Sequence, residues 1–319
     1  MDNTATAVVF EKPGVMALRS VGLVDPTAQD CVVDVLWSGI STGTERLLWD
    51  GSMPAFPGLD YPLVPGYESV GRIVEAGTDT SHAVDDMVFV PGSPGYTNVR
   101  GLFGASSERV IVGGDRLLPI DERIGERGVL LALAATAHHI ACCSRDGLYP
   151  ELIVGHGVLG RLLARVVIAL GGPPPTVWER NPLRAAGGAG YAVCDPDEDD
   201  RRDYRVVADV SGDAGLLNSL ISRVGRGGRI VLGGFYHEPL SFTFPPAFQR
   251  EAEIKIAAEW QRPDLEQTLR LVPHDVLSLN GRITPHQSIR AAAPAYRTAF
   301  GDPHCLKMVL DWRNELQGI

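Results

Sequence analysis

The chain has 319 residues, of which 45% are hydrophobic and 21% charged, so it can bury a core and is not a disordered polyelectrolyte. Its formal net charge is −10 and it has no lysine- and arginine-rich block, which disfavours nucleic acid as a partner. This length favours roughly two domains.

The cysteines and the N-terminus indicate the compartment. The five cysteines form neither a paired framework nor a C-x-x-C motif, which favours a reducing environment. The N-terminus carries Asp2 and lacks the basic region of a signal peptide. The longest apolar stretch, Val129 to Ala137, is far shorter than the roughly 18 residues that span a bilayer. We expect a cytoplasmic protein with no membrane span.

Short β-branched runs, separated by glycine- and proline-rich turns, fill the first 121 residues. The predicted strands are Ala7–Phe10, Cys31–Trp37, Val70–Glu75, Met87–Val90 and Glu108–Val112. Several short strands at close spacing predict a sandwich or a barrel. Residues 1–121 are therefore expected to form one β domain.

From about residue 122 strands and helices alternate. The predicted helices are Arg127–Cys142, Val158–Leu170 and Leu216–Val224, and the predicted strands are Glu151–Val154, Thr176–Trp178, Val206–Val210, Arg229–Leu232 and Glu253–Ala258. This alternation predicts βαβ units around a parallel sheet in residues 122–269. The tail, residues 270–319, carries a predicted helix, Ala291–Phe300, and a predicted strand, Lys307–Leu310.

The sharpest motif is a glycine fingerprint between a predicted strand and a predicted helix. It reads Gly155-His156-Gly157-Val158-Leu159-Gly160. The first glycine permits a tight turn, the second leaves room for a pyrophosphate, and the third lets helix and sheet pack closely. The helix N-terminus supplies N–H groups for the phosphates, and the backbone N–H of His156 is expected to be one of them. The motif predicts a dinucleotide cofactor.

The residues after the next strand bear on the choice of dinucleotide. Glu179 follows that strand, and a carboxylate there accepts hydrogen bonds from ribose hydroxyls and repels a 2′-phosphate. This favours NAD over NADP. Arg180 weakens that preference, because a neighbouring guanidinium can accommodate a phosphate.

Motifs along the whole chain resemble the medium-chain dehydrogenase/reductase family. The matching segments are Ser38–Glu45, Tyr61–Gly71, Asp86–Val88, Ala135–His139, the glycine fingerprint and Gly227–Gly234. The resemblance implies an α/β and β protein, with a GroES-like β-barrel domain joined to a Rossmann domain whose parallel sheet is doubly wound. It also implies that the chain returns to the first domain at its end. The expected cofactor contacts extend to Thr136, Ser211, Gly233 and Gly234.

The sequence departs from the zinc-dependent members of that family. Those members place a cysteine just before a G-T-D-like triplet, where this chain has Ser41-Thr42 before Gly43-Thr44-Glu45. Tyr67 stands where they have a histidine, and Leu131–Leu133 stands where they have a third ligand. A catalytic zinc needs about three nitrogen, sulfur or oxygen ligands from the protein. We expect no metal.

Without zinc, a hydroxyl relay or a general base must take the proton of an alcohol substrate. Thr44 matches the relay hydroxyl of the family's triplet, and Tyr67 is a candidate acid/base or substrate anchor. A half-buried aromatic with a hydrogen-bonded hydroxyl is an equally open interpretation of Tyr67. Ser41 and His139 complete the candidate catalytic set.

Three further residues are expected to play other roles near that set. His138 is an alternative to its neighbour, although a histidine on an alanine-rich helix is more often a satisfied core or surface residue. Glu45 and Glu68 are expected to orient the site or to pair with arginine.

The resemblance also suggests a substrate class. Several segments are similar to members that oxidise the 3-(1-hydroxyethyl) group of a bacteriochlorophyllide to an acetyl group, which implies a tetrapyrrole substrate. Seven aromatic residues are candidates to stack on a large flat ligand, and about half of them are expected to fill ordinary core contacts instead. They are Trp49, Phe56, Tyr61, Tyr96, Phe103, Phe235 and Tyr236.

Other interpretations stay open. One is a zinc-free enone or quinone reductase, or another alcohol dehydrogenase of the family. A second, of a different class, is a non-catalytic nucleotide-binding protein. A homodimer is also expected, because the last Rossmann strand often pairs across a two-fold axis in this family and Glu253–Ala258 is a candidate edge.

Overall fold

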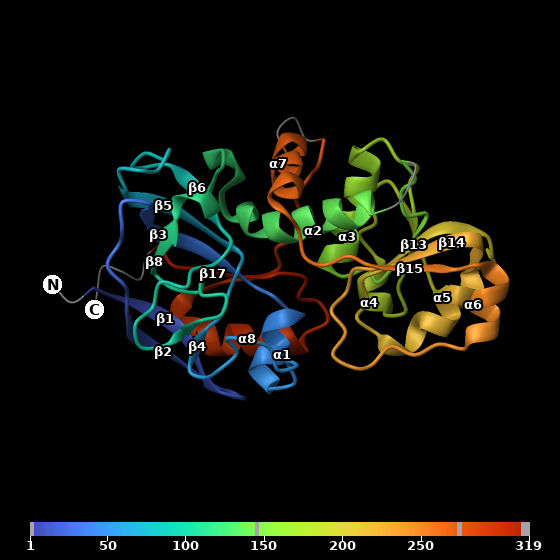
Figure 1. The fold of residues 1–319 in the computed structure, drawn as a ribbon, viewed down its shortest axis with the longest axis horizontal. Helices are drawn as coiled ribbons and strands as arrows, with labels where there is room; N and C mark the ends of the chain where they lie inside the picture. The colour runs from blue at the N-terminus through green and yellow to red at the C-terminus, as the bar shows by residue number, and fades with distance from the viewer. Residues whose placement is uncertain (1–2, 144–146, 273–275, 314–319) are drawn as a thin grey trace. The chain divides into compact units, whose positions relative to one another are not determined.

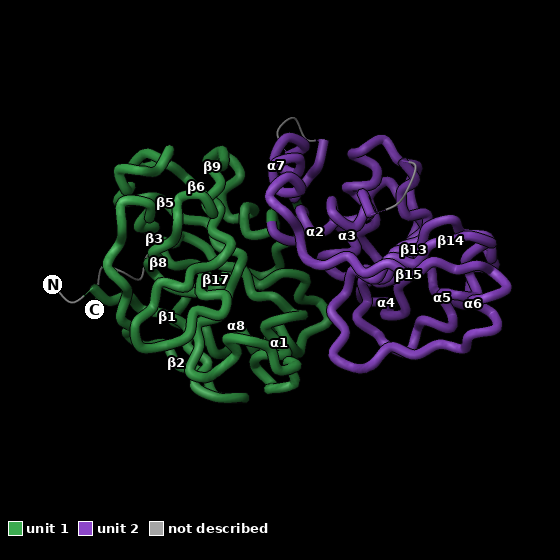
Figure 2. The backbone as a smooth tube through the Cα atoms, viewed as in Figure 1, with its two compact units in different colours: residues 1–131, 280–319 green, residues 132–279 purple. Residues whose placement is uncertain are grey.

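The computed structural model describes residues 3–143, 147–272 and 276–313. They form two compact units (Figure 2). Unit 1 is Met1–Leu131 with Asn280–Ile319, and unit 2 is Ala132–Leu279. The divisions thus fall at 131/132 and 279/280, where the sequence pattern suggested 121/122 and 269/270. No helix in the described ranges is both long and apolar enough to cross a membrane.

Unit 1 is built on two β-sheets. The smaller has the order β2-β1-β4-β7, with bounds Val15–Gly22, Thr4–Lys12, Leu63–Val64 and Arg100–Gly101. The larger has the order β16-β17-β3-β5-β6-β9, with bounds His286–Ser288, Met308–Asp311, Asp30–Ile40, Ser69–Ala76, Met87–Val90 and Leu118–Pro119, and β8 (Arg109–Gly113) also pairs with β3. Several of these strands are apolar runs that are buried on both faces, as β6 is at all of its positions.

The C-terminal segment completes unit 1. Strand β17 pairs antiparallel with β3, and helix α8 (Ala292–Gly301) buries Ala295 and Tyr296 in the core of this unit. In Figure 1 the red C-terminal elements lie among the blue and green strands of unit 1. The remaining helices of the described part of this unit are α1 (Thr44–Asp50) and the 3-10 helices η1 (Gly114–Arg116), η2 (Glu122–Leu130) and η6 (Ile289–Ala291). The end of the chain thus lies in the same unit as its beginning.

The predicted start of the helix at Arg127 is wrong. Residues Glu122–Leu130 form 3-10 turns, and the α-helix α2 spans Leu131–Cys142. The turns are interrupted at Gly125, where φ is 55° and ψ is −138°. Only glycine adopts such a conformation readily, so the regular helix begins after this segment.

Unit 2 carries a six-stranded parallel sheet. Its order is β12-β11-β10-β13-β14-β15, with bounds Ala192–Cys194, Thr176–Trp178, Leu152–Val154, Tyr204–Asp209, Val224–Leu232 and Glu253–Ile256. The chain starts at the central β10, moves outward to β12, and returns to β13 on the other side. This is the doubly wound Rossmann order, so the predicted fold class is confirmed, and β10 and β13 flank the position where the strand order reverses.

Helices connect the parallel strands of unit 2. They are α3 (Val158–Ala169), α4 (Pro182–Ala185), α5 (Leu217–Arg223) and α6 (Phe244–Arg250), with the 3-10 helices η3 (Pro196–Glu198) and η4 (Ala214–Leu216), while α7 (Arg262–Leu271) follows the last strand. Helix α3 buries Leu162, Leu163, Val166 and Val167, as its apolar spacing predicts. The glycine fingerprint lies between β10 and α3, where a dinucleotide-binding loop belongs.

Candidate active site and cofactor site

Three hydroxyl groups meet in unit 1. Ser41 follows β3, Thr44 begins α1, and Tyr67 lies two residues before β5. The Oγ of Ser41 and the Oη of Tyr67 are 2.6 Å apart, and either atom can donate. The side chain of Thr44 lies close enough to the phenol to favour its ionised form and so to lower its pKa, although burial outweighs this effect. The three residues singled out by the sequence motifs are thus neighbours in the structure.

Tyr67 is a neutral phenol in this setting. Its ring is half-buried and packs edge-on against Phe103, with centroids 5.2 Å apart and an interplanar angle of 75°. Burial, and then the charge of Glu68, raise the pKa of the phenol above its usual value. The hydroxyl therefore acts as a hydrogen-bonding group that can pass a proton along, and a resident phenolate is disfavoured.

Behind the hydroxyl groups lies the fully buried carboxyl of Glu45. Its Oε1 accepts the backbone N–H of Ser41 at 3.1 Å, and its Oε2 accepts the hydroxyl of Tyr296 at 2.9 Å. Burial is the main cause that raises the pKa of Glu45 to about 8. At neutral pH the carboxyl is therefore mostly protonated, as expected for an acid removed from water.

Glu68 forms a buried ion pair with Lys307. The Nζ of Lys307 donates to Oε2 of Glu68 at 2.6 Å and to the carbonyl of Ile40 at 3.2 Å, and both side chains are almost completely buried. Burial raises the pKa of Glu68, and the ammonium group opposes that rise. The Oε1 of Glu68 is buried without a hydrogen-bond partner. The partner of Glu68 is therefore a lysine, and the expected arginine was wrong.

The residues at the family's zinc position do not suit zinc. Zinc prefers thiolate, imidazole and carboxylate ligands, whereas the groups present are the hydroxyl of Ser41 and the neutral phenol of Tyr67, bonded to each other. Within the described ranges, no group of three or more histidine, cysteine, aspartate or glutamate side chains is arranged to hold a metal.

The fingerprint loop of unit 2 fits a pyrophosphate. Gly155 has a φ of 102°, which favours glycine, and a Cβ on Gly160 would lie 1.8 Å from the carbonyl oxygen of Gly155. A Cβ on Gly157 would meet nothing within 4 Å, so space remains above this residue. Helix α3 starts at Val158-Leu159 without a side-chain cap, which leaves its first N–H groups available to an anion.

The backbone N–H of His156 donates to Oε2 of Glu179 at 3.2 Å in this structure. Its contact with a phosphate stays a prediction. The other oxygen of Glu179 accepts the N–H of Asn181 at 2.8 Å. The exposed Arg180 reaches Asp197 at 3.4 Å. Glu179 is thus fixed beside the fingerprint.

Three other predicted cofactor residues, Ser211, Gly233 and Gly234, follow the carboxyl ends of β13 and β14. The N–H and hydroxyl of Ser211 donate to Oδ1 of Asp209 at 2.9 and 2.6 Å. The N–H groups of Gly233 and Gly234 donate to the carbonyl of Asp209 at 2.8 and 3.1 Å. The Cα of Ser211 would lie 3.2 Å from a Cβ on Gly155. These residues therefore share the sheet edge that carries the fingerprint.

The two histidines of α2 share one carboxylate. Nδ1 of His138 and Nδ1 of His139 lie 2.9 and 3.0 Å from the two oxygens of Asp264, in the first turn of α7. The hydroxyl of Thr136 donates to the carbonyl of Ala132 at 3.0 Å. No motif pointed to the contact with Asp264, which joins α2 to α7.

Most of the candidate aromatic residues serve ordinary packing. Trp49 packs against Phe10, and the hydroxyls of Tyr61, Tyr96 and Tyr236 donate to the backbone carbonyls of Leu48, Gly104 and Asp209. Phe103 supports Tyr67. Two rings stay largely open to solvent: Phe56 in unit 1, which is 39% exposed, and Phe235 in unit 2, which is 52% exposed.

Comparisons with known proteins show which proteins this chain is similar to. Residues 27–122 match the family model for the alcohol dehydrogenase GroES-like domain. The chain is 52% identical to the 2-desacetyl-2-hydroxyethyl bacteriochlorophyllide A dehydrogenase of Rhodobacter capsulatus, over 96% of this chain and 98% of that protein. It is 51% identical to the protein of the same name from Cereibacter sphaeroides, over 97% and 98% of the two chains.

The fold also matches solved structures. An alcohol dehydrogenase from Escherichia coli CFT073, complexed with NADH, superimposes with a TM-score of 0.83 at 18% identity, covering 97% of this chain and 99% of that one. Identity at this level concerns the fold alone. The near-complete match to the two bacterial dehydrogenases and the match to the family model show that the chain belongs to the medium-chain dehydrogenase/reductase family of nicotinamide-dependent oxidoreductases.

Proposed function

We propose that this enzyme oxidises the 3-(1-hydroxyethyl) group of a bacteriochlorophyllide to a 3-acetyl group, with NAD as the oxidant and without a catalytic zinc. The names and the near-complete match of the two relatives support the substrate. The observation that carries the mechanism is the 2.6 Å contact between Ser41 and Tyr67, beside Thr44, where zinc-dependent members hold their metal.

The chain's own hydroxyl groups would handle the proton of the alcohol. The bound cofactor supplies a hydride acceptor for the carbinol carbon. Thr44 and Tyr67 hold the substrate hydroxyl. As the C=O bond forms, the proton of that hydroxyl passes to Tyr67, the phenol proton moves to Ser41, and the hydroxyl proton of Ser41 passes to water. A neutral phenol suits this relay, because it can donate and accept at once. His139 is a further candidate for an acid/base role.

The substrate's size agrees with an exposed ring. Phe56, in the same unit as Thr44 and Tyr67, is exposed, and stacking its ring on a macrocycle would remove apolar area from water at roughly 25 cal/mol per Å². The proton relay of Thr44, Tyr67 and Ser41 does not depend on this ring.

The test follows the absorption change on forming a conjugated acetyl group, together with NADH fluorescence. Tyr67→Phe and Thr44→Val should each lower kcat about 10²–10⁴-fold. Tyr61→Phe is the matched control, because its hydroxyl serves a backbone carbonyl, and it should stay close to wild type. Rapid oxidation of small alcohols with hydroxyethyl chlorins left untouched would overturn the substrate. Reduction of enones or quinones instead would favour a zinc-free reductase.

The preference for NAD rests on Glu179. Its carboxylate is held beside the fingerprint by two backbone N–H groups, and a fixed negative charge there repels a 2′-phosphate. Glu179→Ala should weaken NAD binding about tenfold, from the loss of charge-assisted hydrogen bonds. Equal wild-type affinity for NADP contradicts this assignment.

The absence of a catalytic zinc rests on the hydroxyl donor set at the family's metal position. Elemental analysis of purified enzyme should find less than stoichiometric zinc, and chelators should leave turnover unchanged. One zinc per chain with chelator-sensitive activity would overturn the proposal. Glu68, His138 and His139 would then be the ligands to test.

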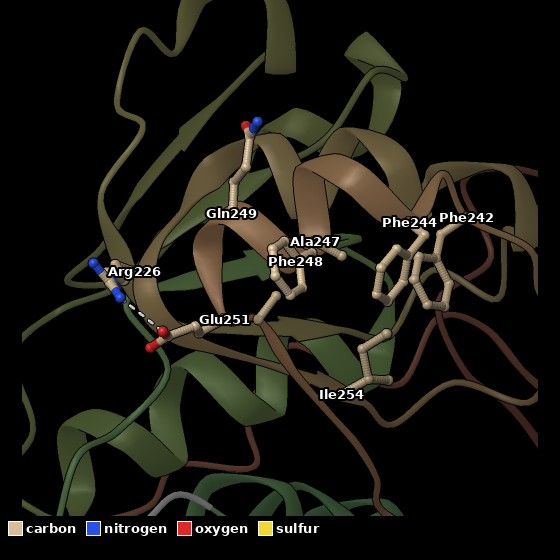
Figure 3. A pocket seen from close by; sticks show the side chains of 9 residues that line it. Arg226, Phe242, Phe244, Ala247, Phe248, Gln249, Glu251 and Ile254 are labelled. Carbon is tan, nitrogen blue, oxygen red and sulfur yellow. Dashed lines mark hydrogen bonds and ion pairs between the residues drawn. The ribbon is translucent and has the colours of Figure 1, made fainter.

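A second copy of this chain is proposed to pair along β15. This strand ends the sheet. Exposed apolar residues lie on it, on α6 and just before α6: Phe242, Phe244, Phe248, Ile254 and Ile256. Figure 3 shows a hollow with the rings of Phe242 and Phe244 side by side near Ile254 and the Arg226–Glu251 ion pair (2.7 Å) toward the other end. An unpaired edge with exposed rings is self-complementary across a two-fold axis.

The charges of the strand agree with such pairing. Antiparallel pairing about a two-fold axis at Ile254 sets Glu253 of one copy opposite Lys255 of the other. Phe248→Asp should convert a dimer to a monomer in light scattering, while Val84→Asp, an equally drastic change on the exposed surface of unit 1, should not. A monomeric wild type at micromolar concentration refutes the dimer.

A further inference from the structure

The side chain of His156, the second residue of the fingerprint, is completely buried, and it points to the segment that follows β11. Its Nδ1 lies 2.7 Å from the carbonyl of Arg184, and its Nε2 lies 2.9 Å from the hydroxyl of Tyr191. A carbonyl can only accept, so Nδ1 donates to it, and Nε2 exchanges a hydrogen bond with the tyrosine hydroxyl, which can either donate or accept. The two rings also meet edge-on, with centroids 5.6 Å apart. One imidazole thus binds two points of the segment 180–191.

Arg161, in the first turn of α3, holds the same segment. It is 5% exposed, and its guanidinium donates to the carbonyls of His156 (2.9 Å), Arg184 (2.8 Å) and Ala186 (2.8 Å). Burial lowers its pKa, so these carbonyls compensate a charge that has been taken out of water. Gly187 makes room for this arrangement, because a Cβ there would lie 2.4 Å from Nη1 of Arg161.

These contacts join the fingerprint to the segment 180–191, and both of these parts of the chain hydrogen-bond Glu179. That residue immediately precedes the segment 180–191, and its carboxylate accepts the N–H of His156 and the N–H of Asn181. The fingerprint, the carboxylate and the following segment therefore form one hydrogen-bonded structure. If the segment moved, the carboxylate would lose the geometry on which discrimination against a 2′-phosphate depends.

We propose that His156 and Arg161 are positioning residues for cofactor selectivity, which hold the segment 180–191 on the fingerprint and so fix the carboxylate of Glu179. This inference rests on the proposed use of NAD. The glycine fingerprint uses His156 only through its backbone, whereas this inference gives a function to its side chain. It gives a function also to Arg161, which lies outside the fingerprint.

The test measures binding alone, by titrating NADH and NADPH fluorescence with the purified full-length enzyme. His156→Ala should raise the Kd for NADH about tenfold, the size expected when two hydrogen bonds that order a loop are lost. The Kd for NADPH should rise less, so the ratio of the NADPH Kd to the NADH Kd should decrease. His156→Asn keeps a donor toward Arg184 and should restore much of the affinity.

Two further variants test the same proposal in case His156→Ala does not fold. Arg161→Lys keeps the charge but cannot reach three carbonyls, and Tyr191→Phe removes one hydroxyl; both should narrow the selectivity. Tyr149→Phe is the matched control, because its hydroxyl donates to the carbonyl of Leu170 elsewhere in unit 2, and it should bind both dinucleotides as wild type does.

The outcomes separate this inference from the choice of cofactor. Wild-type affinity and selectivity in folded His156→Ala and Arg161→Lys enzymes would overturn the positioning role, while leaving NAD in place. Equal wild-type affinity for NADH and NADPH would overturn the assignment of NAD, and with it the selectivity that these residues are proposed to hold.

Discussion

Tyr296 and Glu45 are 251 positions apart in the chain, yet the hydroxyl of Tyr296 donates to Oε2 of Glu45 at 2.9 Å in the interior of unit 1. Through this bond helix α8 supports the carboxyl group that holds the backbone of Ser41. The hydroxyl cluster is therefore anchored from the opposite end of the chain, by a residue with no motif of its own.

Glu45 should make stability depend on pH. The pKa of its carboxyl is raised from 4.5 to about 8 in the folded protein, so the folded state keeps a proton that the unfolded chain releases. Raising the pH from about 4.5 to about 8 should then lower the free energy of unfolding, because the unfolded state binds fewer protons there. Urea unfolding of Glu45→Gln at several pH values should show a flatter profile.

The exposed Glu75 gives the matched control for this measurement. Glu75→Gln should retain the slope of the wild type between these pH values. If Glu45→Gln also retains that slope, the carboxyl of Glu45 is ionised in the folded protein at neutral pH.

The Lys307–Glu68 pair should be strongly coupled. Lys307→Met leaves a buried carboxylate without its cation and should cost about 3–5 kcal/mol of stability. Adding Glu68→Gln should recover part of this loss, because the uncompensated charge is gone. Thermal unfolding of both single variants and the double variant measures the coupling; Arg123→Met, in an exposed pair, should change little. Additive losses would show that the pair does not interact.

Tyr67 should remain protonated well into the alkaline range. Burial and the charge of Glu68 both raise the pKa of its phenol. In a spectrophotometric titration of the tyrosines, the curves of the wild type and of Tyr67→Phe should therefore coincide below about pH 10, the ordinary pKa of a tyrosine. An ionisation near neutral pH that disappears in the variant would instead make Tyr67 a resident phenolate base.

Two glycines of the fingerprint should respond differently to alanine. Gly160→Ala places a methyl group 1.8 Å from a backbone oxygen and should destabilise unit 2. Gly157→Ala meets nothing within 4 Å, so stability should be kept while NADH binding weakens, since the methyl group takes space left for the pyrophosphate. Unfolding curves and NADH titration separate the two effects, and an equal loss of stability in both variants would contradict the distinct roles of the two glycines.

Local pattern predicted much of the fold. The bounds of β6 and β11 match the prediction, because each is a buried run with clear turn residues around it. Strand β2 was missed because most of its residues are exposed or only partly buried and it shows no apolar run. Helix α7 was missed because its surface is largely polar, although the capping box of Gln261 and Asp264 and the early proline were available signals.

The candidate site could be predicted only in part. Ser41, Thr44 and Tyr67 stand in motifs whose local spacing marks them, and the structure brings them together. Tyr296 and Lys307 carry no such signal, because their partners lie 251 and 239 positions away and meet them only through the return of β17 to β3. Likewise, the ring of His156 is committed to Tyr191, a contact that no spacing rule specifies.

The return of the C-terminal segment into unit 1 has a consequence for biosynthesis. A ribosome that has released only the first 131 residues has made Ser41, Glu45, Tyr67 and Glu68, but neither Tyr296 nor Lys307. Until those two are made, Glu45 and Glu68 lack the tyrosine and the lysine that they contact in the folded protein. The Rossmann unit can complete its sheet first, while the contacts that Glu45 and Glu68 make with Tyr296 and Lys307 must wait for those two residues to be translated.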